Sequence, residues 1–136
     1  MSIALQTHVE KRLHSDKIIW LITVRPDGRP HCVPVWFLWD SEMILIFSKP
    51  NTRKVRNIRQ NRSVVLALDD TKNGLDVVIL EGAAELLQKG DKSAILQTYG
   101  EKYHEGLHSI GVSVEAFTTL YSQPICVIPV RAINGQ

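Results

Sequence analysis

The chain has 136 residues, of which 44% are apolar, so it has the size of one domain with a single core. Sixteen basic residues against fourteen acidic ones give a formal charge of +2, which argues against nucleic acid as a partner. The N-terminal segment lacks the apolar run of a signal peptide, and no later segment is apolar over the length needed to span a bilayer. We therefore expect a cytoplasmic protein without a membrane partner.

The first third of the chain predicts one short helix followed by three strands. Apolar residues recur at helical spacing between Ser2 and His14. Ile18–Val24, His31–Trp39 and Met43–Ser48 are rich in β-branched and large apolar residues, which favour strands. Pro26-Asp27-Gly28 favours a tight turn between the first two, because proline presets φ and glycine tolerates positive φ. Successive strands without a helix between them favour antiparallel pairing.

The rest of the chain predicts one more helix, three more strands and a helical segment before the last strand. A helix is expected over Thr52–Gln60, with Thr52 or Asn51 as its cap. Gly82 is expected at a bulge or a close approach of backbones. Gly100, Gly106 and Gly111 predict interruptions of the helical segment. The expected strands are Ser63–Leu68, Val77–Leu87 and Pro124–Val130, and the expected helical stretches are Lys92–Tyr103 and Val114–Leu120.

The two cysteines, Cys32 and Cys126, each lie in a predicted strand, and no second pair stands nearby to complete a metal site. We interpret both as reduced, partly buried thiols. His104 and His108 are four residues apart and could share a helical face as metal ligands. Gly106 between them and the lack of a suitably spaced carboxylate argue against this, so no metal site is expected.

Three segments follow one another in a characteristic order: Trp20–Pro30, His31–Phe37 and Ile46–Arg59. In the second, a proline interrupts the strand just before large apolar residues. Read together, they resemble the short split-barrel flavoproteins of the pyridoxamine 5′-phosphate oxidase superfamily, which also includes deazaflavin-dependent reductases. The chain departs from the pattern at Asn61-Arg62, where family members usually carry Asn-Pro or Asp-Pro. The resemblance extends over roughly Ile18 to Leu87.

The resemblance implies a mainly β protein, a six-stranded antiparallel split barrel of Greek-key type with a few short helices. Residues 1–136 would form one such domain, which binds flavin mononucleotide (FMN). The family pairs as a homodimer, with two equivalent cofactor sites where the subunits meet. We expect the same arrangement here.

The resemblance also implies that the cofactor's phosphate binds at the start of the second predicted helix. Lys54 matches the family's phosphate-binding lysine. Unpaired backbone N–H groups and the positive end of the helix dipole would face the same point. The alternative is a solvated, charged helix face, which is the commoner role of such clusters. The side chains expected around the phosphate are Ser48, Lys49, Thr52, Arg53 and Lys54.

The flavin ring is implied to lie against the second predicted strand, where backbone groups read its polar edge and apolar side chains cover its face. The residues concerned are Val33, Pro34, Val35 and Trp36, and Phe47 is expected to border the ring or the ribityl chain. Such residues also build ordinary cores, and Trp36 is equally interpretable as an aromatic that fills the barrel.

Three further side chains have a functional and a structural interpretation. His31 stands beside the proposed ring strand and could bind flavin or substrate, but a histidine at the start of a strand is more often structural. Tyr99 and Tyr103 are spaced to share a helix face and could cover the partner subunit's flavin, although plain packing is the commoner outcome.

The function that follows is an FMN-dependent oxidoreductase acting on a small organic substrate. In flavin enzymes the cofactor performs the hydride or electron transfer, so no catalytic residue need be apparent in the sequence, and none is assigned. The alternatives are a deazaflavin-dependent reductase, a non-catalytic flavin or electron carrier, a haem-binding relative, and a barrel without cofactor that serves as an interaction module. Pyridoxamine phosphate oxidation itself is not expected, because no additional substrate-binding motif follows Val130.

Overall fold

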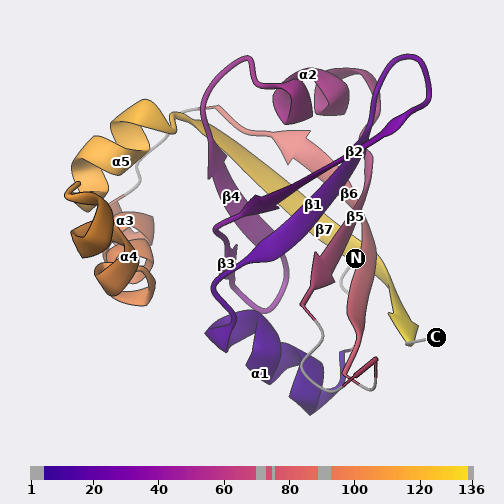
Figure 1. Ribbon diagram of the computed structural model, residues 1–136, viewed down its shortest axis with the longest axis horizontal. Coiled ribbons are helices and arrows are strands. Elements are labelled where there is room, and N and C mark those ends of the chain that lie inside the picture. The colour runs from indigo at the N-terminus through magenta and orange to yellow at the C-terminus, as the bar shows by residue number, and fades with distance from the viewer. Residues whose placement is uncertain (1–4, 70–72, 75, 89–92, 135–136) are drawn as a thin grey trace.

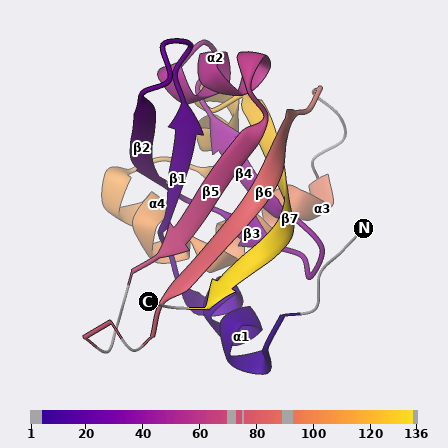
Figure 2. The same ribbon diagram turned by 90° about the vertical axis from the view of Figure 1, so that its right-hand side faces the viewer.

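Seven antiparallel strands form one curled sheet that makes a half-open barrel (Figures 1 and 2). The computed structural model describes residues 5–69, 73–74, 76–88 and 93–134. Across the sheet the strand order is β2-β1-β5-β6-β7-β4-β3. The mainly β, antiparallel fold predicted from the sequence is thereby confirmed. The strands are β1 (Ile19–Val24), β2 (Pro30–Val35), β3 (Leu38–Trp39), β4 (Ile44–Ser48), β5 (Ser63–Leu68), β6 (Val78–Leu86) and β7 (Gln123–Asn134).

The structure has seven strands rather than six because the predicted strand His31–Trp39 divides into β2 and β3. At the break, the backbone N–H of Phe37 donates to the Tyr103 hydroxyl at 2.7 Å, and the Phe37 carbonyl accepts from Nζ of Lys102 at 2.8 Å. Side chains from a distant helix thus bind the backbone groups that would otherwise pair with a neighbouring strand.

Five helices of the described residues lie around the sheet. In Figure 1, α1 lies at the lower end of the barrel, α2 at the upper end, and the other three form a group beside it. That group lies in the sequence between β6 and β7. Within the described residues, no helix combines the length and apolar character needed to cross a membrane. The helices are α1 (Thr7–Ser15), α2 (Arg53–Gln60), α3 (Ser93–Lys102), α4 (His104–Ile110) and α5 (Val114–Leu120).

Of the three glycines expected to interrupt the helical group, Gly111 ends a helix and the other two do not. Gly111 ends α4 with a left-handed φ of 72°, as predicted for an interruption. Gly100 and Gly106 instead lie inside α3 and α4. A Cβ on Gly106 would lie 3.0 Å from the ring of Trp36, so glycine is needed there for close packing rather than for a turn.

The barrel core follows from the period of two along its strands. In β1, Ile19, Leu21 and Thr23 are buried inside, and the alternate residues face the other side of the sheet. Gly82 in β6 lies at a register shift against β7, which confirms the predicted bulge. Cys126 is buried, whereas Cys32 is exposed, which corrects the expectation that both thiols are partly buried.

A second cluster of buried aromatic residues joins the helical group to the barrel. Trp36 stacks on Tyr103 with ring centroids 4.5 Å apart, and on Phe117 at 5.2 Å. Phe47 meets Tyr99 edge to face at 5.2 Å. These contacts come from strands and helices far apart in sequence, so they position the helices against β4 and the β2–β3 junction.

Replacing Tyr103 by phenylalanine is expected to lower the free energy of unfolding by about 1–3 kcal/mol, because the buried N–H of Phe37 loses its acceptor. Tyr99→Phe is the matched control in the same cluster. Its hydroxyl is buried and has no hydrogen-bond partner within the described residues, so its removal should be neutral or stabilising. Chemical denaturation of both variants checks this, and equal losses would contradict the role given to the Tyr103 hydroxyl.

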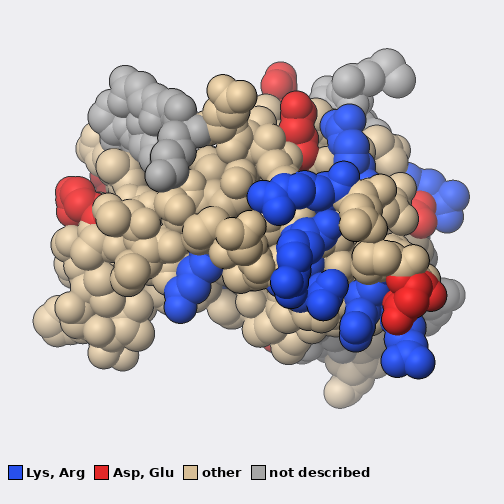
Figure 3. Space-filling view, turned by 90° about the horizontal axis from the view of Figure 1, so that it is seen from above, with Lys and Arg blue, Asp and Glu red and all other residues tan. Residues whose placement is uncertain are grey.

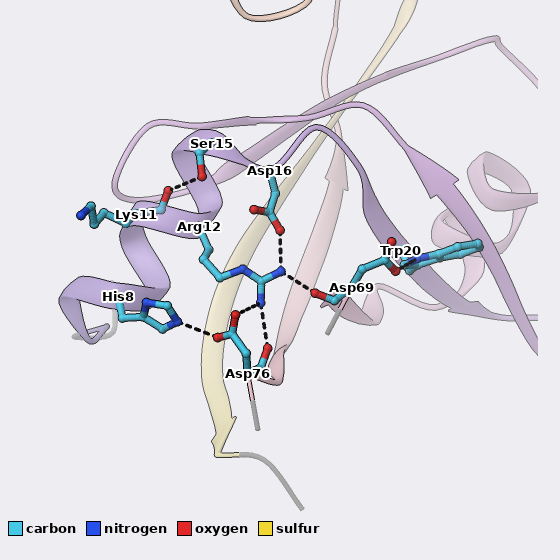
Figure 4. A network of polar contacts seen from close by, with 8 residues as sticks. All are labelled: His8, Lys11, Arg12, Ser15, Asp16, Trp20, Asp69 and Asp76. Carbon is cyan, nitrogen blue, oxygen red and sulfur yellow. Dashed lines mark hydrogen bonds and ion pairs between the residues drawn. The ribbon is translucent and has the colours of Figure 1, made fainter. Parts of the chain in front are cut away.

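A polar network ties α1 to the loop between β5 and β6 (Figure 4). Arg12 has a buried side chain whose Nη1 donates to the backbone carbonyl of Asp76 at 2.8 Å and lies 3.3 Å from its carboxylate. Its Nη2 pairs with Asp16 at 2.6 Å. His8 Nε2 lies 2.6 Å from the other Asp76 oxygen, and Asp69 accepts from the indole N–H of Trp20 at 2.7 Å. The network fixes the lower end of the barrel.

Candidate cofactor site

The upper end of the barrel brings α2 against the β1–β2 hairpin. Asn57, on α2, donates from Nδ2 to the hydroxyl of Thr23, on β1, at 2.9 Å, and both residues are fully buried. A hydrogen bond between two buried side chains holds the helix at a defined place on the sheet, because breaking it leaves polar atoms without water. The first turn of α2 therefore lies close to the hairpin.

The loop from β4 to α2 leaves the start of the helix without a side-chain cap. Ser48 is fully buried, and its hydroxyl donates to the Lys49 carbonyl at 2.8 Å and lies 3.1 Å from the Thr52 hydroxyl. Thr52 occupies the N-cap position, but its side chain makes no capping hydrogen bond. The first-turn backbone N–H groups thus lack the acceptor that a threonine normally supplies, which is a setting suited to an anion.

The charges of this turn have the sign opposite to the usual one. The first turn of α2 contains no acidic residue and begins with Arg53 and Lys54. Cations at the positive end of a helix dipole are unfavourable, and an incoming anion would reverse that effect. Figure 3 shows lysine and arginine side chains gathered on this end of the molecule.

Lys54, like Arg53, is a half-buried cation of this turn, and burial lowers the pKa of Lys54 from the ordinary lysine value. In the part of the chain that the structure describes, the ion pairs join other residues and leave Lys54 and Arg53 without a carboxylate partner. A desolvated ammonium without a counter-ion is costly, and a phosphate group would supply the missing charge. Lys54 therefore fits a phosphate ligand.

The predicted ring residues Val33, Pro34 and Val35 lie on β2, which pairs with β1 and forms one edge of the sheet. Val33 stands opposite Leu21 and shares its side of the sheet, whereas Pro34 stands opposite Trp20 and is exposed on the other side. Such an edge strand presents unpaired backbone groups to a ligand or a second chain. The assignment of these three residues to the flavin ring stays a prediction.

The side chains of Trp36, Phe47 and Lys49 contact aromatic rings of the helical group. Trp36 and Phe47 belong to the aromatic cluster between the barrel and the helical group rather than to the barrel core, and half-buried Trp36 keeps part of its surface exposed. Nζ of Lys49 lies 5.5 Å from the ring centroid of Tyr121, at the end of α5. The ammonium group of Lys49 thus lies beside Tyr121, and its role at a phosphate stays a prediction too.

The structure adds residues that the sequence did not point to. Arg25, in the β1–β2 turn, lies near His31, and its charge contributes to lowering the pKa of that imidazole. Asn57 and Thr23 hold the hairpin and the helix together. A buried asparagine in the middle of a helix is a signal that could have been used, since such a residue needs a partner. Its partner, and the proximity of Arg25, follow only from the tertiary arrangement.

A match to a protein-family model shows the family of the chain. Residues 5–122 match the family model described as pyridoxamine 5′-phosphate oxidase. The chain belongs to the pyridoxamine 5′-phosphate oxidase family. No curated protein sequence matches it.

Solved structures agree with the family at the level of the fold. A structure titled F420 reductase is 22% identical, with a TM-score of 0.75, and the match covers 96% of this chain and 99% of that one. The conserved hypothetical protein Rv2991 of Mycobacterium tuberculosis is 21% identical over 96% of this chain and 84% of that one, with a TM-score of 0.72. HutZ, a haem storage protein of Vibrio cholerae, is 16% identical over 98% and 96%, with a TM-score of 0.73. Proteins of the pyridoxamine 5′-phosphate oxidase fold therefore carry different names and ligands at this level of similarity.

Proposed function

We propose that this member of the family binds FMN non-covalently and transfers reducing equivalents to or from a small organic substrate. The observation that carries the proposal is the uncapped start of α2, where half-buried Lys54 has no carboxylate partner within the described residues. A phosphate monoester supplies both the negative charge and the hydrogen-bond acceptors that this turn lacks. Family membership supports the choice of a flavin-type cofactor.

In this proposal the residues of the chain bind and orient the cofactor. Lys54 and Arg53 neutralise the phosphate, and the first-turn N–H groups of α2 bind its oxygens. The edge of β2 from Val33 to Val35 would hold the ring, and Trp36, which stacks on Tyr103, would border it. Bound flavin supplies the hydride or electron transfer, so the protein's contribution is position, charge and exclusion of water.

The proposal includes a homodimer whose subunits complete each other's sites. The outward face of β1 carries the half-buried residues Trp20, Ile22 and Val24, and Val65 on β5 stands opposite Ile22. Val130 on β7 is 57% exposed and lines the same shallow groove as Ile22 and Val24. An apolar sheet face of this kind suits burial against a second copy. Light scattering on the purified protein tests this, and a monomer across the concentration range would refute it.

The visible spectrum of freshly purified protein tests the cofactor. Oxidised flavin gives one set of bands and deazaflavin another, so the two cofactors are distinguished directly, and a Soret band would identify haem instead. Mass spectrometry of the released molecule then fixes its identity. If saturating FMN neither binds nor raises the melting temperature of the protein, the flavin proposal is wrong.

Replacing Lys54 by glutamine is expected to weaken FMN binding about tenfold or more, because a charge-assisted hydrogen bond to the phosphate is lost. Quenching of flavin fluorescence during titration measures the change. Arg59→Gln, on the exposed side of the same helix, is the control and should leave the dissociation constant nearly unchanged. Riboflavin, which lacks the phosphate, should bind both variants equally, and a loss of riboflavin binding in Lys54→Gln would place Lys54 elsewhere in the site.

A further inference from the structure

The position of His31 beside the first turn of α2 follows from two pairings. His31, on β2, stands directly opposite Thr23 on β1, so the two side chains share one face of the hairpin. Thr23 is the residue that accepts the hydrogen bond from Asn57. Lys54 precedes Asn57 by three residues and shares its face of α2. The strand register and the helix anchor therefore bring His31 and Lys54 to the same place.

The charged side chains that shift the pKa of His31 are all cations. Lys54 and Arg53 face it from α2 and Arg25 from the β1–β2 turn, and they act with burial, the larger cause, to lower the pKa of His31. Within the described chain, none of these three cations forms an ion pair with a carboxylate. An imidazole that faces three cations without carboxylate partners is a favourable place for an anion to bind.

One ring nitrogen of His31 also lacks a hydrogen-bond partner within the described residues. Nδ1 of His31 is buried and has none within the described residues. A protonated imidazole donates from both ring nitrogens, and buried Nδ1 has no acceptor in the described part of the chain. The neutral form is therefore favoured until a ligand brings both negative charge and acceptor oxygens.

We infer that His31 is a second ligand for the cofactor's phosphate, and that it takes up one proton from solvent when the phosphate binds. The inference rests on the proposed function and deepens it. Neutral His31, a proton and the phosphate dianion combine into a complex in which an imidazolium and the Lys54 ammonium both contact the phosphate. Binding then becomes tighter as the pH falls, from the pKa of His31 in the complex down to its lower pKa in the free protein.

Titration of FMN at several pH values between about 5.5 and 8 tests the inference, with wild type, His31→Gln and Lys54→Gln compared. The ratio of the His31→Gln to the wild-type dissociation constant should rise by roughly tenfold as the pH falls through this range. The ratio removes the effect of the phosphate's own protonation near about pH 6, which weakens binding equally in both proteins. Calorimetry in two buffers of different ionisation enthalpy should show proton uptake by wild type in excess of His31→Gln. A constant ratio and equal proton uptake would overturn the role of His31.

A second measurement separates this inference from the flavin proposal. The NMR resonance of the His31 ring, identified by its loss in His31→Gln, is followed against pH with and without inorganic phosphate. Its pKa should lie below the ordinary histidine value in free protein and rise when phosphate is added. A rise with phosphate but no FMN binding would refute only the flavin. If FMN binds and the His31 pKa stays unchanged, only the role of His31 is refuted. If FMN does not bind and the pKa does not rise, both proposals are refuted.

Discussion

Replacing Arg12 by methionine is expected to lower the free energy of unfolding by about 3–5 kcal/mol, because the buried carboxylate of Asp76 loses its buried cationic partner and keeps only the more exposed His8 of the two. Methionine keeps much of the aliphatic volume of the arginine, so the loss reports on the charge rather than on a cavity. The backbone carbonyl of Asp76 and the carboxylate of Asp16 lose donors in the same step. Denaturation by urea at neutral pH measures the effect.

The control for this variant is Lys11→Met on the same helix, since Lys11 is exposed and takes no part in the network through its ammonium group. It should change stability by less than about 0.5 kcal/mol. A variant as stable as the control would show that Arg12 contributes no net stability to the lower end of the barrel.

Replacing Gly82 by valine is expected to cost about 3 kcal/mol of stability. A Cβ at this position would lie 2.8 Å from the backbone carbonyl oxygen of Ile128 and 2.9 Å from Cγ1 of Val127. Because one of these atoms belongs to the backbone, the clash cannot be relieved by a side-chain rotation, and β6 and β7 must move apart at their bulge. Thermal unfolding should show the loss, and Gly82→Ala should show a smaller loss of the same sign.

Gly100→Ala is the matched control for the alanine variant. It lies inside α3, where a Cβ would meet the side chain of Val114 at 3.6 Å, an ordinary van der Waals distance. Alanine there should be neutral or stabilise the protein by up to about 1 kcal/mol, since glycine is a poor helix former. If both glycines tolerate alanine equally, the close approach of β7 to Gly82 is wrong.

The sequence predicted the strands well because each carries a local signal. Ile19–Val24, Ile44–Ser48 and Ser63–Leu68 consist of apolar and β-branched residues in short runs, and the structure keeps them within a residue or two. The break between β2 and β3 has no such signal. It depends on Tyr103 and Lys102, which reach Phe37 from more than sixty residues away. The sequence also did not predict α4, because Gly106 indicates a helix interruption. In the structure this glycine allows Trp36 to pack closely against the helix.

For the candidate site, the sequence indicated the residues at the start of α2 but not that Arg25 and His31 lie beside them. Ser48, Thr52, Arg53 and Lys54 follow one another along the chain, so their grouping is a property of one loop and one helix turn. The addition of Arg25 and His31 requires the register of β1 with β2 and the bond from Asn57 to Thr23. No spacing along the chain encodes that proximity. The roles of Lys49 and of the predicted ring residues remain predictions. A structure with bound cofactor would test them.

The place of β7 in the sheet has a consequence for the order of assembly. In the sheet of described residues, β7 alone joins the block β2-β1-β5-β6 to the pair β4-β3, because it bonds to β6 on one side and to β4 on the other. Among the strands of this sheet, β7 is the last to be synthesised. Until it emerges, the nascent chain holds two sheet fragments with no ladder between them, and a stop codon placed before Gln123 leaves them permanently unjoined.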